Sequence, residues 1–197
     1  MTTRLPKLEL LSAALGQDER TAVDPLLEAA LHGDGDAFSR LVKPHLSLLY
    51  GIAHRACGDR ALAEDAVQET LVLAYRRLGR LRAPSALRSF LAGIASRRAQ
   101  TLLRGARRRA AREEASQIPE RPARADEALE AARLAEHIRL ALAELPAKRQ
   151  QVVLLKLEGR LSYEEIAVAL GTSEGSARVL AHLGMKQLRA ALEDQRG

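Results

Sequence analysis

Arginine is the residue type with the clearest chemical capability in this sequence, and many arginines gather near the middle of the chain. Seven of them fall within one short stretch that contains no acidic residue: Arg97, Arg98, Arg104, Arg107, Arg108, Arg109 and Arg112. So many cations repel one another unless an anion lies close by. We therefore favour phosphate contact over a merely solvated charged face. Such contacts would position a nucleic acid without reading its sequence.

The helix predicted over residues 61–80 precedes these arginines and presents an acidic face. Its polar side consists of Glu64, Asp65, Gln68 and Glu69. Its apolar stripe, at helical spacing, consists of Ala63, Val67, Leu71 and Ala74. Amphipathicity alone indicates an ordinary surface helix.

No group of residues in the sequence has the spacing of an enzyme active site. The histidines form no close pair; they are His32, His45, His54, His137 and His182. Cys57 is the single cysteine, so we expect neither a disulfide framework nor a cysteine metal cluster. Glycine-rich phosphate loops are absent as well. We expect a protein that binds without catalysis and needs no cofactor or metal.

The composition predicts an all-α chain with a polyanionic partner. Hydrophobic residues make up 47% of the 197 residues and aromatic residues only 3%, so the cores must be leucine, alanine and valine, which favours helices. The net charge of +6 and the isoelectric point near 10.0 suit a nucleic acid. The sequence shows neither an apolar run of about 18 residues nor a signal peptide. We expect a cytoplasmic protein without membrane insertion.

The chain divides into a leader, two small helical domains and a flexible linker. Residues 1–24 form the leader, and residues 25–112 and 126–197 show helical periodicity. Prolines and mixed charges break every period in residues 113–125, which we interpret as the linker.

Start and stop signals define the helices of the first domain. Asp24 and Pro25 begin the first helix as N-cap and first helical residue. Asp36 is expected to cap the second helix, which Pro44 kinks and Gly58 ends.

The second domain contains a helix-turn-helix pattern, which many DNA-binding regulators share. Ser162 and Glu165 form a capping box, Gly171 ends that helix, and a second helix follows the turn. The buried stripe of the second helix is expected to be Ala177, Ala181, Gly184 and Leu188. Its candidate DNA contacts are Thr172, Ser173, Glu174, Ser176, Arg178 and His182.

Two stretches resemble the extracytoplasmic-function group of bacterial sigma factors. AEDAVQET, in the helix of residues 61–80, is similar to the polymerase-binding helix of sigma region 2. LPAKRQQVVLLKLEG combined with SYEEIAVALGTS is similar to sigma region 4. The resemblance spans residues 25–192 and implies a transcription initiation factor built of these two helical domains.

The resemblance also implies partners and roles. The partners are promoter DNA and core RNA polymerase, at the clamp of the largest subunit and the flap of the second largest; an anti-sigma factor or other regulator is a further one. Polymerase contacts would come from Glu64, Asp65, Gln68 and Glu69. The loop of residues 79–89, a solvated connector by composition alone, would open the −10 element with Arg80, Arg82, Ser85 and Arg88. The next helix would add Arg97, Arg98, Thr101, Arg104, Arg107, Arg108 and Arg109, and the recognition helix would read the −35 element.

The sequence departs from the family pattern in three places. The first two are Leu71 and Tyr75 in place of Phe and Trp, and Arg97 and Thr101 in place of Asn and Asp. The third is Leu180 and Leu183, where the recognition helix of the family has basic residues. These leucines either read an A/T-rich or thymine-methyl pattern or form, with Val179, a patch for another protein.

Two other classes of function are compatible with the same residues. One is a helix-turn-helix regulator that binds DNA or polymerase without initiating transcription. The other is an interaction protein whose sigma-like surfaces only sequester polymerase. Pull-down of core polymerase separates a free-standing regulator from the other two classes, and run-off transcription with purified core separates initiation from sequestration.

Neutralising Arg107, Arg108 and Arg109 together is expected to weaken promoter binding across all sequences alike, because phosphate contacts contain no base information. Gel-shift titration against several promoter sequences measures this. A loss confined to one sequence would contradict the assignment.

Overall fold

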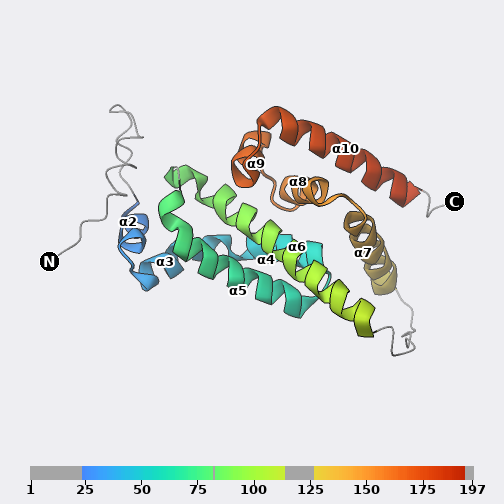
Figure 1. Cartoon of the computed structure of the whole chain (residues 1–197), viewed down its shortest axis with the longest axis horizontal. Helices are drawn as coiled ribbons and strands as arrows, with labels where there is room; N and C mark the ends of the chain where they lie inside the picture. The colour runs from blue at the N-terminus through green and yellow to red at the C-terminus, as the bar shows by residue number, and fades with distance from the viewer. Residues whose placement is uncertain (1–23, 82, 114–126, 194–197) are drawn as a thin grey trace.

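The computed structural model of the chain describes residues 24–81, 83–113 and 127–193, and these residues form helices without any β-strand (Figure 1). The all-α prediction is therefore confirmed. Our expectations for residues 1–23, for Arg82 and for residues 114–125 of the linker lie outside the described residues.

The first two helices begin at aspartates. Helix α2 spans Pro25–Leu31, and the Asp24 carboxylate accepts a hydrogen bond from the Leu26 amide at 2.9 Å, as expected for an N-cap. Helix α3 spans Gly35–Val42. Our prediction of its cap was wrong: Asp34, rather than Asp36, accepts the amides of Asp36 and Ala37 at 2.9 and 3.0 Å. The helix therefore begins before Asp36, inside the glycine-containing break.

Pro44 separates two helices rather than kinking one. It lies in a 3₁₀ turn, η1 (Lys43–His45), after which α4 runs over Leu46–Cys57. Gly58 ends α4 in the left-handed conformation with φ of 69°, which glycine adopts without a Cβ penalty. Asp59 then caps α5 (Arg60–Arg77) by accepting the Leu62 amide at 2.8 Å.

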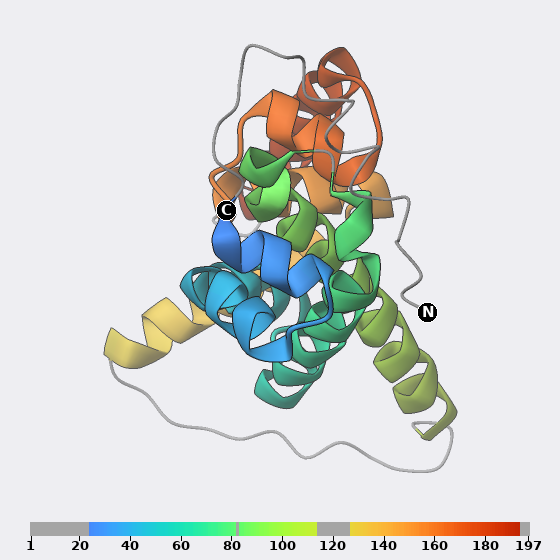
Figure 2. The same ribbon diagram turned by 90° about the vertical axis from the view of Figure 1, so that its left-hand side faces the viewer.

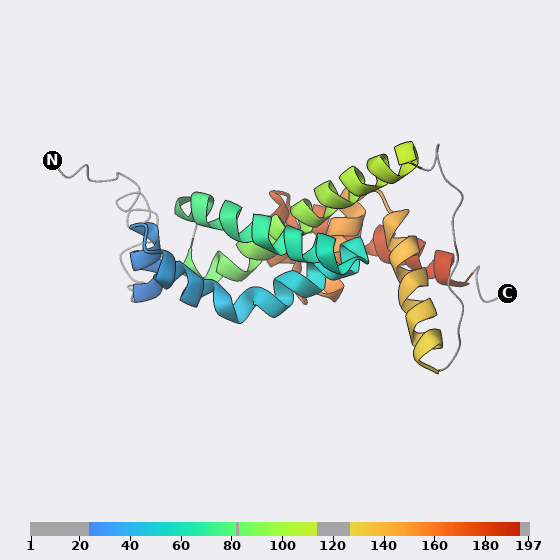
Figure 3. The same cartoon turned by 90° about the horizontal axis from the view of Figure 1, so that it is seen from below.

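The long helix α6 (Leu87–Glu113) is the centre of the structure. Two 3₁₀ turns, η2 (Leu78–Arg80) and η3 (Pro84–Ala86), lead into it from α5. Its apolar side packs against α4 and α5, where Leu91, Ala95 and Ala99 are completely buried. Figure 3 shows α4 and α5 running beside α6 on this side.

The second half of the described chain is a compact group of helices. It contains α7 (Glu127–Ala143), α8 (Ala147–Leu157), α9 (Tyr163–Leu170) and α10 (Glu174–Glu193). Both hydrogen bonds of the predicted capping box at Ser162 and Glu165 are present, and Gly171 ends α9 with φ of 67°. The predicted stripe of α10 is buried: Ala177, Ala181, Gly184 and Leu188. The helix-turn-helix prediction is therefore confirmed.

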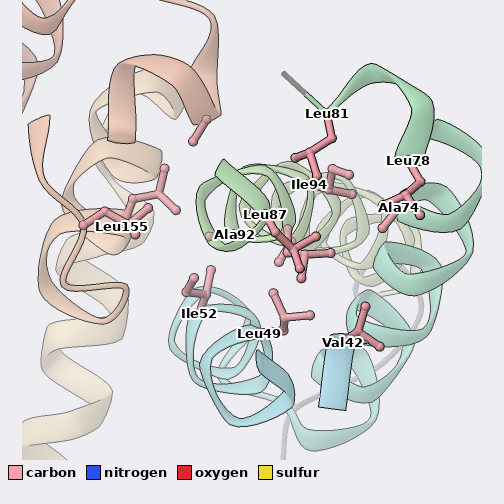
Figure 4. Close-up of a cluster of buried hydrophobic side chains, with 14 of the residues drawn as sticks. Val42, Leu49, Ile52, Ala74, Leu78, Leu81, Leu87, Ala92, Ile94 and Leu155 are labelled. Atoms are coloured by element: carbon pink, nitrogen blue, oxygen red, sulfur yellow. The ribbon is translucent and has the colours of Figure 1, made fainter. Parts of the chain in front are cut away.

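The two halves pack directly on each other, a feature that the sequence analysis did not predict. Helices α8, α9 and α10 lie on one side of α6, and α4 and α5 lie on the other (Figure 2). Both clusters of buried apolar side chains contain residues from both halves. In Figure 4, Leu155 of α8 lies on one side of a cluster whose facing members include Ile52 of α4 and Ala92 of α6.

Gly93 of α6 explains how closely the halves approach. A Cβ atom at residue 93 would overlap the carbonyl oxygen of Ala169 in α9. A glycine inside a helix costs roughly 1 kcal/mol relative to alanine. Close packing accounts for glycine at residue 93, because the end of α9 can contact the α6 backbone only where there is no side chain.

We predict that Leu155→Ala lowers the free energy of unfolding by roughly 2–5 kcal/mol, because a fully buried leucine leaves a cavity in the shared core. Leu157→Ala, at a half-exposed position two residues on, is the matched control and should cost about 0.5 kcal/mol or less. Urea unfolding, followed by circular dichroism, measures both. A separate early transition for one half in the unsubstituted protein would contradict a shared core.

Candidate functional site

The acidic face of α5 is exposed along its length. All four predicted polymerase-binding residues, Glu64, Asp65, Gln68 and Glu69, lie at the surface. Glu64 accepts a hydrogen bond from Arg60 at 2.8 Å, and Glu69 pairs with Arg98 of α6 at 3.5 Å. Among the described residues, Asp65 and Gln68 have no ion-pair or hydrogen-bond partner for their side chains. These two polar groups are therefore available to bind another molecule.

Val72 continues this face and was missed by the sequence analysis. Its side chain lies four residues after Gln68 and is 51% exposed. Its position four residues after Gln68 was visible in the sequence, but we assigned its neighbours Leu71 and Leu73 to the apolar side and left Val72 unassigned. An exposed apolar residue beside unpaired polar groups is the composition of a protein-binding surface.

Tyr75 has a structural role in the described chain. Its hydroxyl donates a hydrogen bond to the Gly33 carbonyl at 2.7 Å, and its ring meets Phe38 edge-on with centroids 5.1 Å apart. Leu71 is partly buried against the core. At these two departures from the family pattern, Tyr75 therefore holds the turn between α2 and α3, and Leu71 fills part of the core.

The basic segment predicted as a loop over residues 79–89 ends within the first turn of α6 and contains both exposed and engaged groups. Arg80 and Ser85 are exposed. Arg88 instead reaches the second half of the chain, where it donates a hydrogen bond to the Gly159 carbonyl at 2.5 Å and lies 3.5 Å from the Glu165 carboxylate. Partial burial, reinforced by the charge of Arg88, lowers the pKa of His45.

Besides Arg88 and Arg98, the arginines of α6 whose side chains the structure describes divide into two groups. Arg97 donates to the Ala169 carbonyl at 2.7 Å, and Arg104 donates to Gln100 at 3.3 Å. Partial burial and the nearby charge of Arg77 lower the pKa of Arg97. The other group is fully at the surface and consists of Arg107, Arg108 and Arg109. Thr101 is exposed too, with its hydroxyl bonded to the Arg97 carbonyl at 2.9 Å.

Gln100 is a polar residue of α6 that the sequence analysis did not single out. It is 2% exposed, and its amide nitrogen donates to the Ala147 carbonyl at 2.7 Å and to Gln150 at 2.9 Å. Gln100 therefore joins Arg88 and Arg97 as a group on α6 that binds the second half. A glutamine among arginines has no sequence signature that distinguishes it from a surface residue.

The predicted recognition residues of α10 and its turn lie at or near the surface. Ser173 caps the helix by accepting the Ser176 amide at 3.1 Å. Arg178 donates a hydrogen bond to the Glu174 carboxylate at 2.6 Å, and its guanidinium lies over the Tyr163 ring. Ser176 and His182 are exposed, and Thr172 is partly exposed. The Ser176 hydroxyl accepts a hydrogen bond from the Ser173 hydroxyl at 2.9 Å and keeps its own donor, so Ser176 and His182 are the better placed of the six candidates to contact bases.

The apolar residues of α10 are not equivalent. Val179 is 57% exposed and Leu183 is 37% exposed, whereas Leu180 packs partly against the core. Val179 and Leu180 also line a groove of about 600 Å³ between the starts of α8 and α10, beside Lys148 and Gln151. The outward leucine of the predicted pair is Leu183, and Val179 lies next to it on the helix surface.

In the described ranges, residues 24–81, 83–113 and 127–193, no group of three or more histidine, cysteine, aspartate or glutamate side chains could hold a metal ion. None of the helices in those ranges combines the length and the apolar character that crossing a membrane requires.

Comparison with known proteins identifies both halves. Two family models match the chain: Sigma-70 region 2 over residues 41–109, and Sigma-70, region 4 over residues 135–188. The first match contains α4, α5 and most of α6, and the second contains the helix-turn-helix.

Individual relatives cover most of the chain. RNA polymerase sigma factor CarQ of Myxococcus xanthus is 35% identical over 171 residues, which is 84% of this chain and 95% of CarQ. ECF RNA polymerase sigma factor SigE of Mycolicibacterium smegmatis is 30% identical over 84% of this chain and 67% of SigE. Among solved structures, CnrH in complex with the cytosolic domain of CnrY has a TM-score of 0.62 at 27% identity, covering 86% of this chain and 96% of that one.

We predict that Leu183→Arg makes duplex DNA binding more salt-dependent, because an outward arginine on α10 adds one phosphate contact. The slope of log affinity against log salt concentration should steepen by about one. Leu157→Arg adds the same charge at an exposed position of α8 and is the control. Equal slopes for the two variants would show that this face of α10 does not meet DNA.

Proposed function

We propose that α5 binds core RNA polymerase and that α6 and α10 bind promoter DNA. The premise is the family: the chain belongs to the extracytoplasmic-function group of the sigma-70 family of transcription initiation factors. The single observation that supports this most directly is the uncovered acidic face of α5. The side chains of Asp65 and Gln68 have no partner among the described residues, and Val72 beside them is half exposed. A surface of this kind suits a basic, partly apolar protein surface. The resemblance to region 2 supports the clamp of the largest polymerase subunit as that partner surface.

The DNA-binding part of the proposal rests on two sets of exposed groups. Arg107, Arg108 and Arg109 supply cations at the end of α6, and Arg80 and Ser85 supply polar groups in the loop before it. We assign the −10 contacts to these residues. We assign the −35 contacts to α10, with Ser176, Val179 and His182 as the outward side chains.

The domain assignment follows from these roles. Residues 25–112 would bind polymerase and the −10 element, and residues 126–197 would bind the −35 element and the polymerase flap. The chain acts by binding, in the cytoplasm, where bacterial transcription takes place. CnrH was solved with the cytosolic domain of CnrY, which supports a protein regulator for this chain as well.

We expect the double variant Asp65→Lys and Glu69→Lys to lose affinity for core polymerase by about 10- to 100-fold, because like charges would face the clamp. Glu28→Lys, an exposed acid on α2, changes the net charge by the same amount as Asp65→Lys alone, so it is the matched control for that single variant and should bind normally. Binding of labelled protein to purified core measures both.

Glu69→Lys alone also breaks the pair with Arg98, so Asp65→Lys is the cleaner single change. Binding of the double variant within twofold of the unsubstituted protein, with helical content intact, would remove α5 from the polymerase interface.

A further inference from the structure

The outer face of α10 is the side of the helix opposite its buried stripe. α10 is the second helix of the helix-turn-helix, and in that motif the second helix lies in the major groove of DNA. Five exposed residues at helical spacing form this side, and we call them the outer face: Gly175, Val179, His182, Leu183 and Lys186. The side chains that meet base edges therefore come first from this set.

The centre of the outer face is apolar and open to close approach. Val179 is 57% exposed, the largest exposed fraction among the large hydrophobic side chains of the described residues. Leu183, one turn later, is 37% exposed. One turn before Val179, no atom beyond the backbone of α10 itself lies within 4 Å of the place where a Cβ on Gly175 would stand. A ligand can therefore approach the helix backbone closely and reach the valine side chain.

Arg178, the arginine next to Val179, is held to one side of the outer face. Its guanidinium donates a hydrogen bond to the Glu174 carboxylate at 2.6 Å and lies 5.1 Å from the centroid of the Tyr163 ring, at the start of α9. Lys156 lies over the same ring, 4.5 Å from its centroid. Arginine is the usual reader of guanine, through paired hydrogen bonds. The outer face contains no arginine, and the nearest one is directed toward α9.

The charges of α10 favour DNA as the occupant of this face. Besides Arg178, the helix contains the exposed cations Lys186 and Arg189, and its acids Glu174 and Glu193 lie at its two ends. A positively charged helix suits a polyanion. Base edges are contacted by the N-terminal residues of a recognition helix, so Lys186 and Arg189 are placed for phosphates, which position the helix without specifying sequence.

The 5-methyl group of thymine is the apolar group that base edges offer in the major groove. The other groups by which the four base pairs differ there are hydrogen-bond donors and acceptors. A valine that faces a donor or acceptor removes it from water without providing a partner, which is unfavourable. A valine that faces the methyl group buries apolar surface on both sides. Val179 therefore favours thymine over the other bases at the position that it meets.

We propose that Val179 is a specificity-determining residue that reads thymine through its 5-methyl group, so that the duplex bound by α10 has thymine at the base pair facing this side chain. The proposal rests on the −35 role proposed for α10 and is independent of the roles of α5 and α6. It assigns the exposed apolar surface of this helix to DNA. A patch for another protein is the alternative that the experiment decides.

Removing the methyl group from the DNA tests the proposal directly. The full-length chain first selects its tightest-binding sequence, at low salt, from a pool of duplexes whose central segment is randomised. The selected duplex is then remade with deoxyuridine in place of one thymidine at a time. Each replacement removes one 5-methyl group from the major groove and leaves the hydrogen-bonding groups of the base pair unchanged. Fluorescence anisotropy of the labelled duplexes measures the affinities.

We expect one replacement to weaken binding by about fourfold, the factor that corresponds to one buried methyl group. In Val179→Ala the same replacement should cost less than twofold, because the side chain that contacts the methyl group is gone. Val168→Ala removes the same atoms from an exposed valine of α9 and is the matched control. It should keep the fourfold difference, and circular dichroism should show equal helical content in all three proteins.

Two results would overturn the proposal: no replacement weakens binding, or the costly replacement remains as costly in Val179→Ala. α10 would then read bases by hydrogen bonds, and its proposed DNA role would stand, with Val179 left for a protein partner. A different result identifies failure of the proposed function. If the pool does not bind, or binds without enrichment of any sequence, the −35 role of α10 is wrong and the thymine reading is wrong with it.

Discussion

The contact between Gly93 and the last turn of α9 is the constraint on which the arrangement of the molecule depends. It brings the two backbones together without an intervening side chain and places Arg97 within 2.7 Å of the Ala169 carbonyl. Arg88 and Gln100 then reach carbonyls on either side of this point. Polar groups along α6 thus become part of an internal interface, and the two halves share their buried clusters.

The two candidate surfaces of the first half are also linked to each other. Glu69 on the acidic face of α5 pairs with Arg98 of α6, so the helices that we propose to bind polymerase and DNA meet through opposite charges. Both side chains remain partly exposed, so this pair contributes little to stability. Its effect is on the position of the charges: the acids of α5 and the arginines of α6 form adjacent surfaces of opposite sign. A sigma factor has to present two such surfaces to two different partners.

Local signals made much of the fold predictable. Asp24, Gly58 and the Ser162–Glu165 box act on neighbouring backbone groups, so their roles can be read from adjacent residues. The cap at Asp34 was misplaced because two aspartates flank Gly35 and both suit an N-cap. The interface between the halves was not predictable, because the acceptors for Arg88 and Arg97 are backbone carbonyls, which every residue has. Charge alone made these arginines look free for phosphate, and only the packing of α8 and α9 shows that they are occupied.

The shared core also bears on the lifetime of the protein in the cell. Leu155 and Ile166 are completely buried in a cluster that includes residues of the first half. Separation of the halves would therefore expose apolar surface to water. A chain that opens without a partner would present that surface to proteases and to other unfolded chains. The rate at which the protein is degraded would then depend on the fraction bound to the transcription machinery. Bound molecules would persist, and unbound molecules that open would be degraded.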